Sequence, residues 1–414
     1  MFKENEFSIF DIVSGISEAV DLVSPELNDH HKKVAYISYN IATEMDLPGD
    51  EVRDIVLGAI LHDIGAFTTE ERLEVMAARF ADSEYSQHPT MGYKLLRGFE
   101  PLLKAAELIN YHHVHFSKLT EKIPMGSFII HLADRLSLIR DEGREILEQI
   151  PEIMAAINSH RNVFHPEPLA ALDRLSKMEY FWIETSTIPP TEVLSDRMMF
   201  SKKSLDLEAL RCLAKVISQI IDFRSRFTST HSSGVAAVAR ELTTISGFSD
   251  RECKLMEIAG YLHDLGKLAI PSDIIEKHGA LDHEEFNEMR KHSYYTYTVL
   301  SKVEGFEQIA MWAAYHHERL DGNGYPFHIK GEDFSKLARI MSVADIVTAI
   351  TEDRPYRLGM DSEKAMEVLF GMAENGGIDK STVEIVKDNF YLINDVRIQA
   401  QHEALQEYKA FYEF

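Results

Sequence analysis

The sequence predicts an all-α protein that contains two copies of one helical unit. Nearly every long segment of the 414-residue chain carries apolar side chains at intervals of three to four positions, which is typical of amphipathic helices. Convincing alternation of apolar and polar residues, the pattern of half-buried strands, is absent from the sequence. Histidines and aspartates also recur at matching intervals in the two halves, and this repeat indicates duplication of a structural unit.

The predicted helices are separated by proline and glycine. In the first half, Val34, Ile37, Ile41 and Met45 mark one apolar helical face. Because proline and glycine disfavour continued helix, we expect interruptions at the following positions: 48–49, 151, 166–168, 189–190, 271, 279 and 322–326.

A longer helix is predicted over about 202–226, after the Pro-Pro pair at 189–190. It is the best candidate for a helical connector between a first domain at 1–200 and a second domain at 201–414. The stretch from about 394 is also amphipathic. For both segments we favour the simpler interpretation, a helix that packs within its own domain. The apolar face of the longer helix consists of Leu205, Leu210, Leu213, Val216, Ile217 and Ile220.

Composition excludes several classes of protein. The hydrophobic content of 45% is that of a soluble globular protein, and no apolar run approaches the ~20 residues of a membrane helix. The N-terminus lacks the basic and apolar regions of a secretion signal. Cys212 and Cys253 give no disulfide framework. We therefore expect a cytoplasmic protein.

The formal net charge of −24 at pH 7 constrains the partners. DNA, RNA and anionic membranes attract basic surfaces, so we expect none of them as partners. A small anionic substrate is still allowed, provided that metal ions or a few Arg and Lys residues supply local positive charge.

The repeat consists of seven residues of metal-ligand type in each half. The step from the first to the second residue is 32 in both halves, and the step from the fourth to the fifth is 24 in both. The step from the fifth to the seventh residue is 22 in the first half and 29 in the second, where the extra length holds an Asp-Gly-Asn-Gly-Tyr-Pro loop. The first-half set is His30, His62, Asp63, His88, His112, His113 and Asp134, and the second-half set is His231, His263, Asp264, His292, His316, His317 and Asp345.

The second-half set suits a pair of metal ions. A His-Asp pair at the end of a helix points two neighbouring side chains into one cavity, so Asp264 could bridge two metals while His263 binds one. Mixed imidazole and carboxylate ligands suit Fe, Mn, Ni or Zn. Two adjacent metals activate water and stabilise the entering and leaving oxygens of a displacement at phosphorus. The pattern therefore predicts hydrolysis of a phosphate ester.

Residues 202–400 resemble the HD-GYP domain, a branch of the HD superfamily of helical metal-dependent phosphohydrolases. The resemblance implies a bacterial phosphodiesterase of second-messenger signalling that hydrolyses cyclic di-GMP, 3',3'-cyclic GMP-AMP or both to the linear dinucleotide. It rests on His231 at the head of a helix, His263-Asp264-Leu265-Gly266-Lys267, Lys277, His292, His316-His317-Glu318-Arg319, Asp321-Gly322-Asn323-Gly324-Tyr325-Pro326, Ala344-Asp345 and Arg354-Pro355-Tyr356-Arg357.

The resemblance also implies roles for individual residues. Asp264 and Lys267 would be catalytic, and Lys267 would contact the scissile phosphate. The seven second-half residues would hold two divalent ions, with Fe or Mn favoured over Ni or Zn. Besides Lys267, the substrate would be contacted by Arg319, Gly324, Tyr325, Pro326, Arg354 and Arg357.

Two positions depart from the family pattern. Members with a third metal carry Glu four residues before the first histidine, where this chain has Phe227, so two ions are expected. Thr348 replaces an Asp that is usual three residues after the aspartate at position 345.

Residues 1–200 resemble a plain HD domain. They keep all seven ligand-type residues as a second candidate metal site, but Ala66 stands where the second half has Lys267. Neither a Gly-Tyr-Pro loop nor an Arg-Pro-Tyr-Arg stretch follows. We expect a metal-binding regulatory or sensory domain. The alternatives are a nucleotide phosphomonoesterase (5'-nucleotidase), acting for instance on the linear product, and a structural relic.

A rival function for the whole chain is a receptor that binds a cyclic dinucleotide without turnover. It would signal through the segment near 202–226. Lys267 and the Gly-Tyr-Pro loop favour the enzyme. The sequence leaves open the purines of the ring, the identity of the metals, further cleavage to mononucleotides, and the oligomeric state, a homodimer included.

Overall fold

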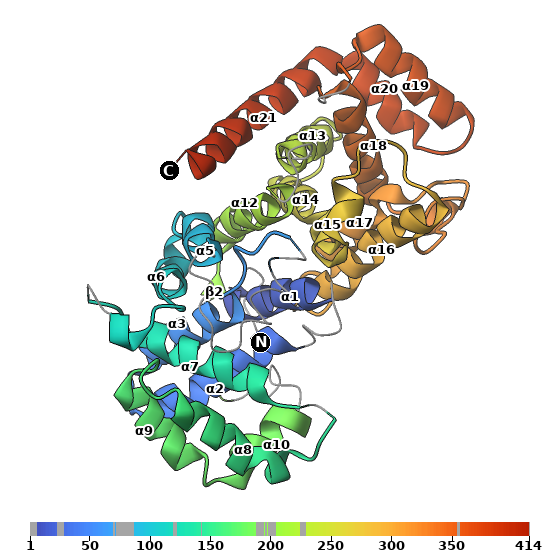
Figure 1. The fold of residues 1–414 in the computed structure, drawn as a ribbon. Coiled ribbons are helices and arrows are strands. Elements are labelled where there is room, and N and C mark those ends of the chain that lie inside the picture. Colours follow the sequence, from blue (N-terminus) through green and yellow to red (C-terminus); the bar gives the residue numbers. More distant parts are fainter. Residues whose placement is uncertain are drawn as a thin grey trace. The chain divides into compact units, whose positions relative to one another are not determined.

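The chain divides into two compact units that are built almost wholly from helices (Figure 1), which confirms the predicted all-α fold class. One unit spans residues 9–203, and the other comprises residues 204–414 together with the first eight residues. Phe227, Arg354 and the Pro-Pro pair at 189–190 lie outside the described part of the chain. A computed structural model describes residues 6–22, 29–68, 71, 87–118, 122–141, 143–187, 194, 197, 204–223, 229–353 and 357–413.

The N-terminal unit is a bundle in which α2 packs against α3, α7 and α9, while α5 packs against α6. Its core includes the buried side chains of Ile41, Leu57, Ile60 and Leu96. The described helices are α1 (Ile9–Asp21), α2 (His30–Glu44), α3 (Gly49–Ile60), α5 (His88–Leu96), α6 (Leu103–Asn110), α7 (Met125–Ile139), α8 (Ile146–Ser159), α9 (Pro166–Leu175) and α10 (Glu179–Thr187), with short 3₁₀ helices η2 (Glu100–Leu102) and η3 (Phe116–Lys118).

One predicted interruption is wrong, because α8 continues through Pro151. Glu145 caps the N-terminus of this helix, because its carboxylate accepts hydrogen bonds from the backbone N–H groups of Leu147 (2.7 Å) and Glu148 (3.3 Å). Its apolar face, which includes Ile153, is buried against the rest of the unit. A proline inside a helix removes one backbone hydrogen bond and crowds the carbonyl four residues earlier, and the tertiary packing of α8 outweighs this cost at the exposed Pro151.

The C-terminal unit consists mainly of helices around α13. This helix packs against α14, α18 and α21, while η5 lies against α16. The elements are β1 (Phe7–Ser8), β2 (Ser204–Leu205), α12 (Leu207–Asp222), α13 (His231–Ile245), α14 (Asp250–Leu262), η5 (Leu265–Ala269), α15 (Ser272–Ile275), α16 (His283–Leu300), α17 (Glu307–Ala314), η6 (Tyr315–His317), η7 (Gly331–Asp333), α18 (Lys336–Thr351), α19 (Ser362–Glu374), α20 (Lys380–Asp388) and α21 (Phe390–Tyr412).

The segment considered as a connector forms α12, which packs on α14 within the C-terminal unit. Asp206 caps it, because its carboxylate accepts from the backbone N–H of Ala209 at 2.8 Å. Just before it, β2 pairs antiparallel with β1, with Phe7 opposite Leu205. These two-residue strands are the only strands in the described residues. The last helix, α21, begins at Phe390, four residues before the predicted start.

Local capping places the ends of two helices that carry predicted site residues. At the start of α14, the Ser249 hydroxyl accepts from the Glu252 N–H at 3.3 Å, and the Glu252 carboxylate accepts from the Ser249 N–H at 2.8 Å. Asp282 and Glu285 form the same reciprocal arrangement at the start of α16. Such capping boxes satisfy the free N–H groups of a first turn. His263 follows directly on α14, and His292 lies midway along α16.

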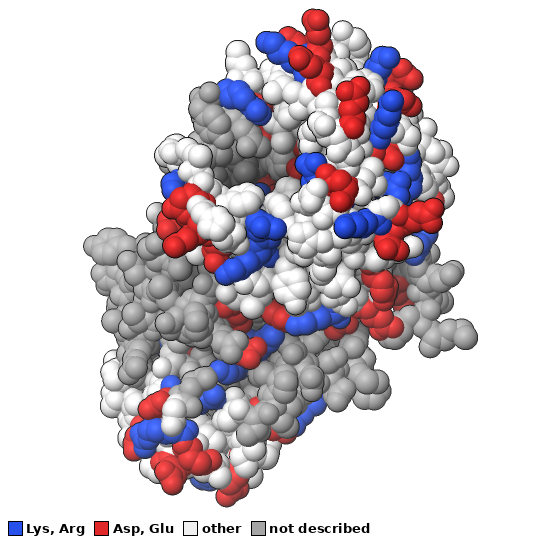
Figure 2. All heavy atoms as spheres, turned by 90° about the vertical axis from the view of Figure 1, so that its right-hand side faces the viewer, with Lys and Arg blue, Asp and Glu red and all other residues white. Residues whose placement is uncertain are grey.

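None of the described helices combines the length and the apolarity needed to span a bilayer. Figure 2 shows one face of the molecule, on which acidic and basic side chains are interspersed. On that face, the net charge of −24 is therefore not displayed as a uniform acidic surface.

Candidate metal centres

The seven second-half residues predicted as metal ligands lie together in the C-terminal unit. They come from the start of α13, the end of α14, the middle of α16, η6 and α18. Each of the five imidazoles has a nitrogen close to a carboxylate oxygen of one of the two aspartates, an arrangement that suits a bound cation. The approaches are 3.2 Å from His231 Nε2 to Asp345 Oδ1, 3.3 Å from His263 Nε2 to Asp264 Oδ2, 3.4 Å from His292 Nε2 to Asp264 Oδ1, 4.0 Å from His316 Nε2 to Asp264 Oδ1 and 3.9 Å from His317 Nδ1 to Asp345 Oδ2.

Three of these imidazoles are oriented by the backbone of their own helices. The Nδ1 atoms of His263, His292 and His316 lie 2.7, 2.6 and 2.6 Å from the carbonyl oxygen three residues earlier. An Nδ1–H that donates to a carbonyl leaves Nε2 as the nitrogen available to a metal. Burial also lowers the pKa of His292 to about 3, so its imidazole is unprotonated at neutral pH.

His231 is oriented by a chain of side chains that the sequence analysis missed. Its Nδ1 lies 3.1 Å from Oε2 of Glu352, and Glu352 in turn accepts from Nε2 of Gln401 at 2.9 Å. Arg397, which is also on α21, donates to Oε1 of Gln401. Burial opposes protonation of His231, but Glu352 and Asp345 together raise the pKa of its imidazole to about 10. A carboxylate behind a histidine is a common way to strengthen a metal ligand.

A glycine allows the His-Asp turn to lie against the next ligand helix. A Cβ atom on Gly266 would stand 1.9 Å from the carbonyl oxygen of His292. The N–H of Gly266 donates to Oγ1 of Thr296 at 2.9 Å, and that hydroxyl donates to the carbonyl of His263 at 3.1 Å. The N-terminal unit uses the same contact, since a Cβ on Gly65 would lie 2.2 Å from the carbonyl oxygen of His88. Only glycine permits such an approach.

Lys267 supplies positive charge within the C-terminal cluster. Its Nζ lies 2.5 Å from Oδ2 of Asp264, and its side chain is 21% exposed. Burial alone would favour the neutral acid, but Lys267 and His263 hold the pKa of Asp264 well below its usual range. The Asp264 carboxylate raises the pKa of Lys267 against the effect of burial. A charged lysine next to a carboxylate of the cluster is well placed to meet an anion.

The Gly-Tyr-Pro loop folds back over the cluster. A Cβ on Gly324 would lie 2.4 Å from the N atom of Arg319, and the N–H of Tyr325 donates to the carbonyl of His317 at 3.2 Å. The ring of Tyr325 lies 4.9 Å from that of His317, and the guanidinium of Arg290 lies over the Tyr325 ring, 4.8 Å from its centroid. The loop therefore forms one wall beside the second histidine of the His-His pair.

The buried carboxylate of Glu318 holds the stretch of backbone that follows the loop. It accepts from the N–H of Phe327 at 2.6 Å and from the N–H of Ile329 at 3.1 Å, and the residue is 1% exposed. Hydrogen bonds to a charged acceptor are stronger than neutral ones. Glu318 lies within the stretch that resembles the family motif, but its contacts with Phe327 and Ile329 depend on the folded loop.

The predicted substrate contacts differ in their placement. Tyr325 and the adjacent Gly324 and Pro326 belong to the loop beside the cluster, whereas Arg319 pairs with Asp321, with Nη2 and Oδ2 2.8 Å apart. Nη2 of Arg357 donates to the carbonyl of Ala349 at 2.6 Å. Arg354 lies outside the described residues. Thr348, where the family has Asp, donates to the carbonyl of Ala344 at 2.8 Å.

The seven first-half residues also lie together, in the N-terminal unit. Two candidate ligand groups are formed, in each of which the ligand atoms lie within 4.8 Å of one another: Asp63, His88, His112 and His113, and His30, His62 and Asp134. The two groups are joined by the adjacent His62 and Asp63, whose Nε2 and Oδ2 lie 3.2 Å apart. Nδ1 of His62 and Nδ1 of His112 lie 2.8 and 2.6 Å from the carbonyl three residues earlier, as in the C-terminal unit.

Several buried polar atoms of this N-terminal cluster lack hydrogen bonds. They are His30 Nε2, His62 Nε2, Asp63 Oδ1 and both carboxylate oxygens of Asp134. Their near neighbours are other atoms of the same cluster: Nε2 of His30 lies 3.3 Å from Oδ1 of Asp134, and Oδ1 of Asp63 lies 3.0 Å from Nε2 of His88. Imidazole nitrogens and carboxylate oxygens that converge in this way fit a divalent cation.

Other features of the N-terminal cluster differ from the C-terminal one. Ala66 is fully buried in place of Lys267. Arg135, which follows the last aspartate, donates from Nη2 to Nδ1 of His113 at 3.0 Å. The hydroxyl of Ser137 lies 3.0 Å from Nδ1 of His30, where the C-terminal cluster uses a carboxylate.

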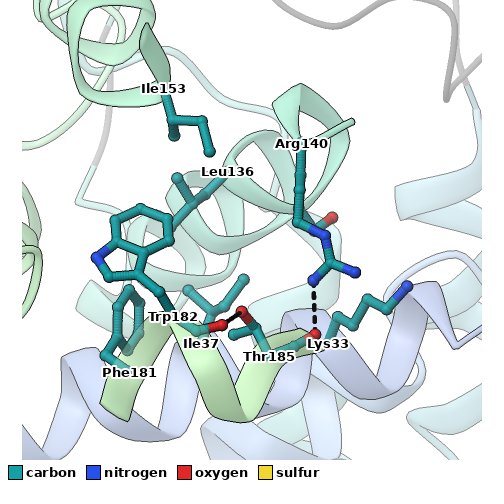
Figure 3. Close-up of a pocket in the computed structure, with 9 residues that line it drawn as sticks. Lys33, Ile37, Leu136, Arg140, Ile153, Phe181, Trp182 and Thr185 are labelled. Atoms are coloured by element: carbon teal, nitrogen blue, oxygen red, sulfur yellow. Dashed lines mark hydrogen bonds between the residues drawn. The ribbon is translucent and has the colours of Figure 1, made fainter. Parts of the chain in front are cut away.

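A small pocket adjoins this cluster on α2, α7, α8 and α10 (Figure 3). Ser137 contributes to its lining and links it to His30. Figure 3 shows Arg140 donating to the carbonyl of Thr185, at 2.6 Å, with the indole of Trp182 on the apolar side of the pocket. The pocket therefore has a cationic edge and an apolar floor.

Comparison with protein families identifies the domains that contain the two clusters. Residues 28–139 and residues 215–382 each match an HD domain family. The chain contains two HD domains. Each match includes a whole seven-residue cluster, so the N-terminal and C-terminal HD domains each carry a set of His and Asp side chains that could hold metal ions.

The chain is similar to curated bacterial phosphodiesterases. The 3'3'-cGAMP-specific phosphodiesterase 1 of Vibrio cholerae is 27% identical over 388 residues, which cover 90% of each protein. A cyclic di-GMP phosphodiesterase response regulator of Xanthomonas campestris is 34% identical over 179 residues, or 43% of this chain and 47% of its own length. A crystal structure of a cyclic GMP-AMP specific phosphodiesterase of V. cholerae aligns with a TM-score of 0.62 and 21% identity over 97% of this chain and 98% of its own. That alignment establishes a shared fold.

Proposed function

We propose that the C-terminal HD domain hydrolyses a phosphodiester bond of a bacterial cyclic dinucleotide and releases the linear dinucleotide. The observation that carries this proposal is the position of Lys267, 2.5 Å from Asp264 within the cluster. The wall formed by Tyr325 lies beside the same cluster. The N-terminal HD domain repeats the ligand residues with neither the lysine nor the loop, and it is therefore not the site of this reaction.

Each residue has a defined task in this proposal. Two divalent ions, with Fe and Mn proposed ahead of Ni and Zn, would be held by the five histidines and two aspartates, and metals in such sites activate water and neutralise phosphate. The Lys267 ammonium donates to a phosphate oxygen and stabilises the charge that develops on the departing ribose oxygen. Glu352 holds the imidazole of His231 in place. Tyr325 bounds the space in which the ring of the substrate lies.

The extent of the similarities indicates which substrate to test first. The relative that aligns over 90% of this chain is named for 3'3'-cGAMP, whereas the Xanthomonas relative named for cyclic di-GMP aligns over less than half of it. The tandem arrangement of HD domains therefore favours 3',3'-cyclic GMP-AMP, with cyclic di-GMP as the second substrate.

The test compares two lysines of neighbouring segments. The full chain, loaded with Mn(II) or Fe(II), is incubated with each cyclic dinucleotide, and the products are separated by chromatography. Lys267→Ala copies the residue of the N-terminal domain and should lower turnover by about 100-fold or more, because it removes charge stabilisation from the reacting phosphate. Lys254→Ala is the matched control, since Lys254 pairs with Asp250 on the outer side of α14.

Metal content must be measured on the same samples. The proposal predicts that Lys267→Ala retains its metal and still binds the substrate, and that Lys254→Ala turns over like the unaltered chain. Tight binding of a cyclic dinucleotide by the unaltered, metal-loaded chain without any linear product would identify a receptor and overturn the proposal.

A further inference from the structure

An eighth histidine lies against the metal cluster of the N-terminal HD domain. His31 is 3% exposed, and its ring centroid lies 5.4 Å from that of His30 and 5.1 Å from that of His62. His31, His62 and Asp63 each offer one ligand atom, and these three atoms lie within 4.8 Å of one another. Ligands that share one metal ion are spaced in this way.

The ring of His31 is held by a buried carboxylate. Its Nδ1 is hydrogen bonded to Oδ1 of Asp21, which is 5% exposed and lies at the end of α1. With Nδ1 engaged, Nε2 is the nitrogen that remains for a metal. A carboxylate behind the imidazole fixes the tautomer and raises the basicity of the ligand nitrogen, and partners of this kind are typical of metal-binding histidines.

The C-terminal HD domain shows that the aspartate does not require a histidine. Asp222 occupies the equivalent place, ten residues before Ser232 as Asp21 is ten residues before His31. Ser232 donates to both oxygens of this carboxylate, from its N–H at 3.1 Å and from its hydroxyl at 2.8 Å. A small hydroxyl therefore suffices for packing at this position, and the imidazole of the N-terminal domain has to be explained by another interaction.

We propose that His31 is a metal ligand of the N-terminal HD domain, positioned by Asp21, and that it binds the same divalent ion as His62 and Asp63. Atoms of these two residues that lack hydrogen bonds, Nε2 of His62 and Oδ1 of Asp63, belong to the same cluster. The N-terminal centre would thus have one imidazole more than the C-terminal centre. It also has Ala66 in place of a lysine, so no ammonium from that position competes with the metal for Asp63.

The test is a metal titration of the full chain after removal of metal with a chelator. Co(II) is added, its visible absorption is followed, and bound metal per chain is measured after desalting. His31→Ser copies the C-terminal residue and can still donate to Asp21. We expect it to raise the apparent Kd of one class of sites at least about tenfold, and Asp21→Asn to raise it less.

The two domains are distinguished with His62→Ala combined with Asp63→Ala, which removes at least one ligand from each of the three N-terminal groups. The sites that survive in this variant belong to the C-terminal domain, and His31→Ser should leave their Kd unchanged. Thermal unfolding of the metal-free variants separates a ligand from a packing residue. The proposal is overturned if His31→Ser and Asp21→Asn bind as much Co(II) as tightly as the unaltered chain, whatever their effect on metal-free stability.

Discussion

At the scale of single residues, the C-terminal site depends on how each imidazole is oriented and charged. His231 lies between Asp345 and Glu352, 3.2 and 3.1 Å from their carboxylate oxygens. Despite burial, these carboxylates raise the pKa of the imidazole to about 10. In the metal-free protein His231 is therefore protonated at neutral pH, and a metal ion must displace that proton.

This competition predicts that metal affinity at the C-terminal site rises with pH. Because the pKa of metal-free His231 is raised to about 10, the proton is bound below that pH, and affinity should increase by up to about tenfold per pH unit between about pH 7 and pH 9. Calorimetric titrations in buffers of different ionisation enthalpy count the protons released. Glu352→Gln removes one carboxylate, lowers the pKa of His231 and should release fewer protons. An unchanged proton count in that variant would contradict the assignment.

Residue identity alone predicted much of the site, but not the residues that support it. Histidines and aspartates rarely recur at matched spacing by chance, so these residues could be predicted as candidate ligands. Glu352 and Gln401 are common surface residue types, and only the packing of α21 on α13 brings them to His231. The pairing of Asp21 with His31 could have been found from the sequence, because an aspartate stands ten residues before His31 in the first half and ten residues before Ser232 in the second.

At the scale of elements, one close contact in each domain sets the geometry of the His-Asp turn. We predict that Gly266→Ala disturbs the C-terminal cluster, because its Cβ would lie 1.9 Å from the carbonyl oxygen of His292. The cost should be about 1–3 kcal/mol of the free energy of unfolding, with loss of turnover. Denaturant unfolding and turnover measure both effects. Gly371→Ala, which meets nothing within 4 Å on α19, is the control and should leave turnover intact.

A second prediction at this scale concerns the loop beside the cluster. Glu318→Ala leaves the N–H groups of Phe327 and Ile329 without their acceptor, at a cost of about 1–3 kcal/mol. The loop should lose its fixed position, so turnover falls while metal content is maintained. Glu332→Ala, at an exposed position on η7, is the matched control. Loss of metal together with turnover would show instead that Glu318 supports the cluster itself.

The elements also show why the predicted boundaries of the helices were less accurate than the prediction that these segments are helical. Periodicity predicted helices correctly, but it cannot weigh one proline against tertiary packing. Pro151 sits in a helix with a strong N-cap and a buried face, so α8 continues through it. For α21, the predicted start near 394 misses one turn, because Asn389 caps the helix with no side-chain hydrogen bond that a sequence signal would mark.

At the scale of the whole molecule, two similar clusters of candidate metal ligands differ in what surrounds them. The spacing of the ligand residues predicted the duplication, and the differences at Lys267 and in the loop are the basis for expecting hydrolysis in the C-terminal half. Sequence could not predict how completely the N-terminal ligands converge. The seven ligand residues come together only when five separate segments have packed, and three of these segments carry the buried atoms without hydrogen bonds.

These buried atoms predict that metal stabilises the N-terminal HD domain. Chelation should lower the unfolding temperature, and adding metal at about 100 times the Kd should restore about 2.7 kcal/mol for each site. Differential scanning calorimetry with and without Mn(II) measures this shift. Asp134→Asn should reduce the shift, because both carboxylate oxygens of Asp134 lack hydrogen-bond partners. An unfolding temperature that is indifferent to metal would argue that this cluster remains empty.

The most direct test of the central claim is product analysis with a variant of the C-terminal His-Asp pair. The full chain, supplied with Mn(II) or Fe(II), is given 3',3'-cyclic GMP-AMP and cyclic di-GMP, and products and bound metal are measured for the unaltered chain and for His263→Ala combined with Asp264→Ala. The account predicts a linear dinucleotide from the unaltered chain, and loss of both turnover and C-terminal metal in the double variant. Full activity in the double variant would contradict the account.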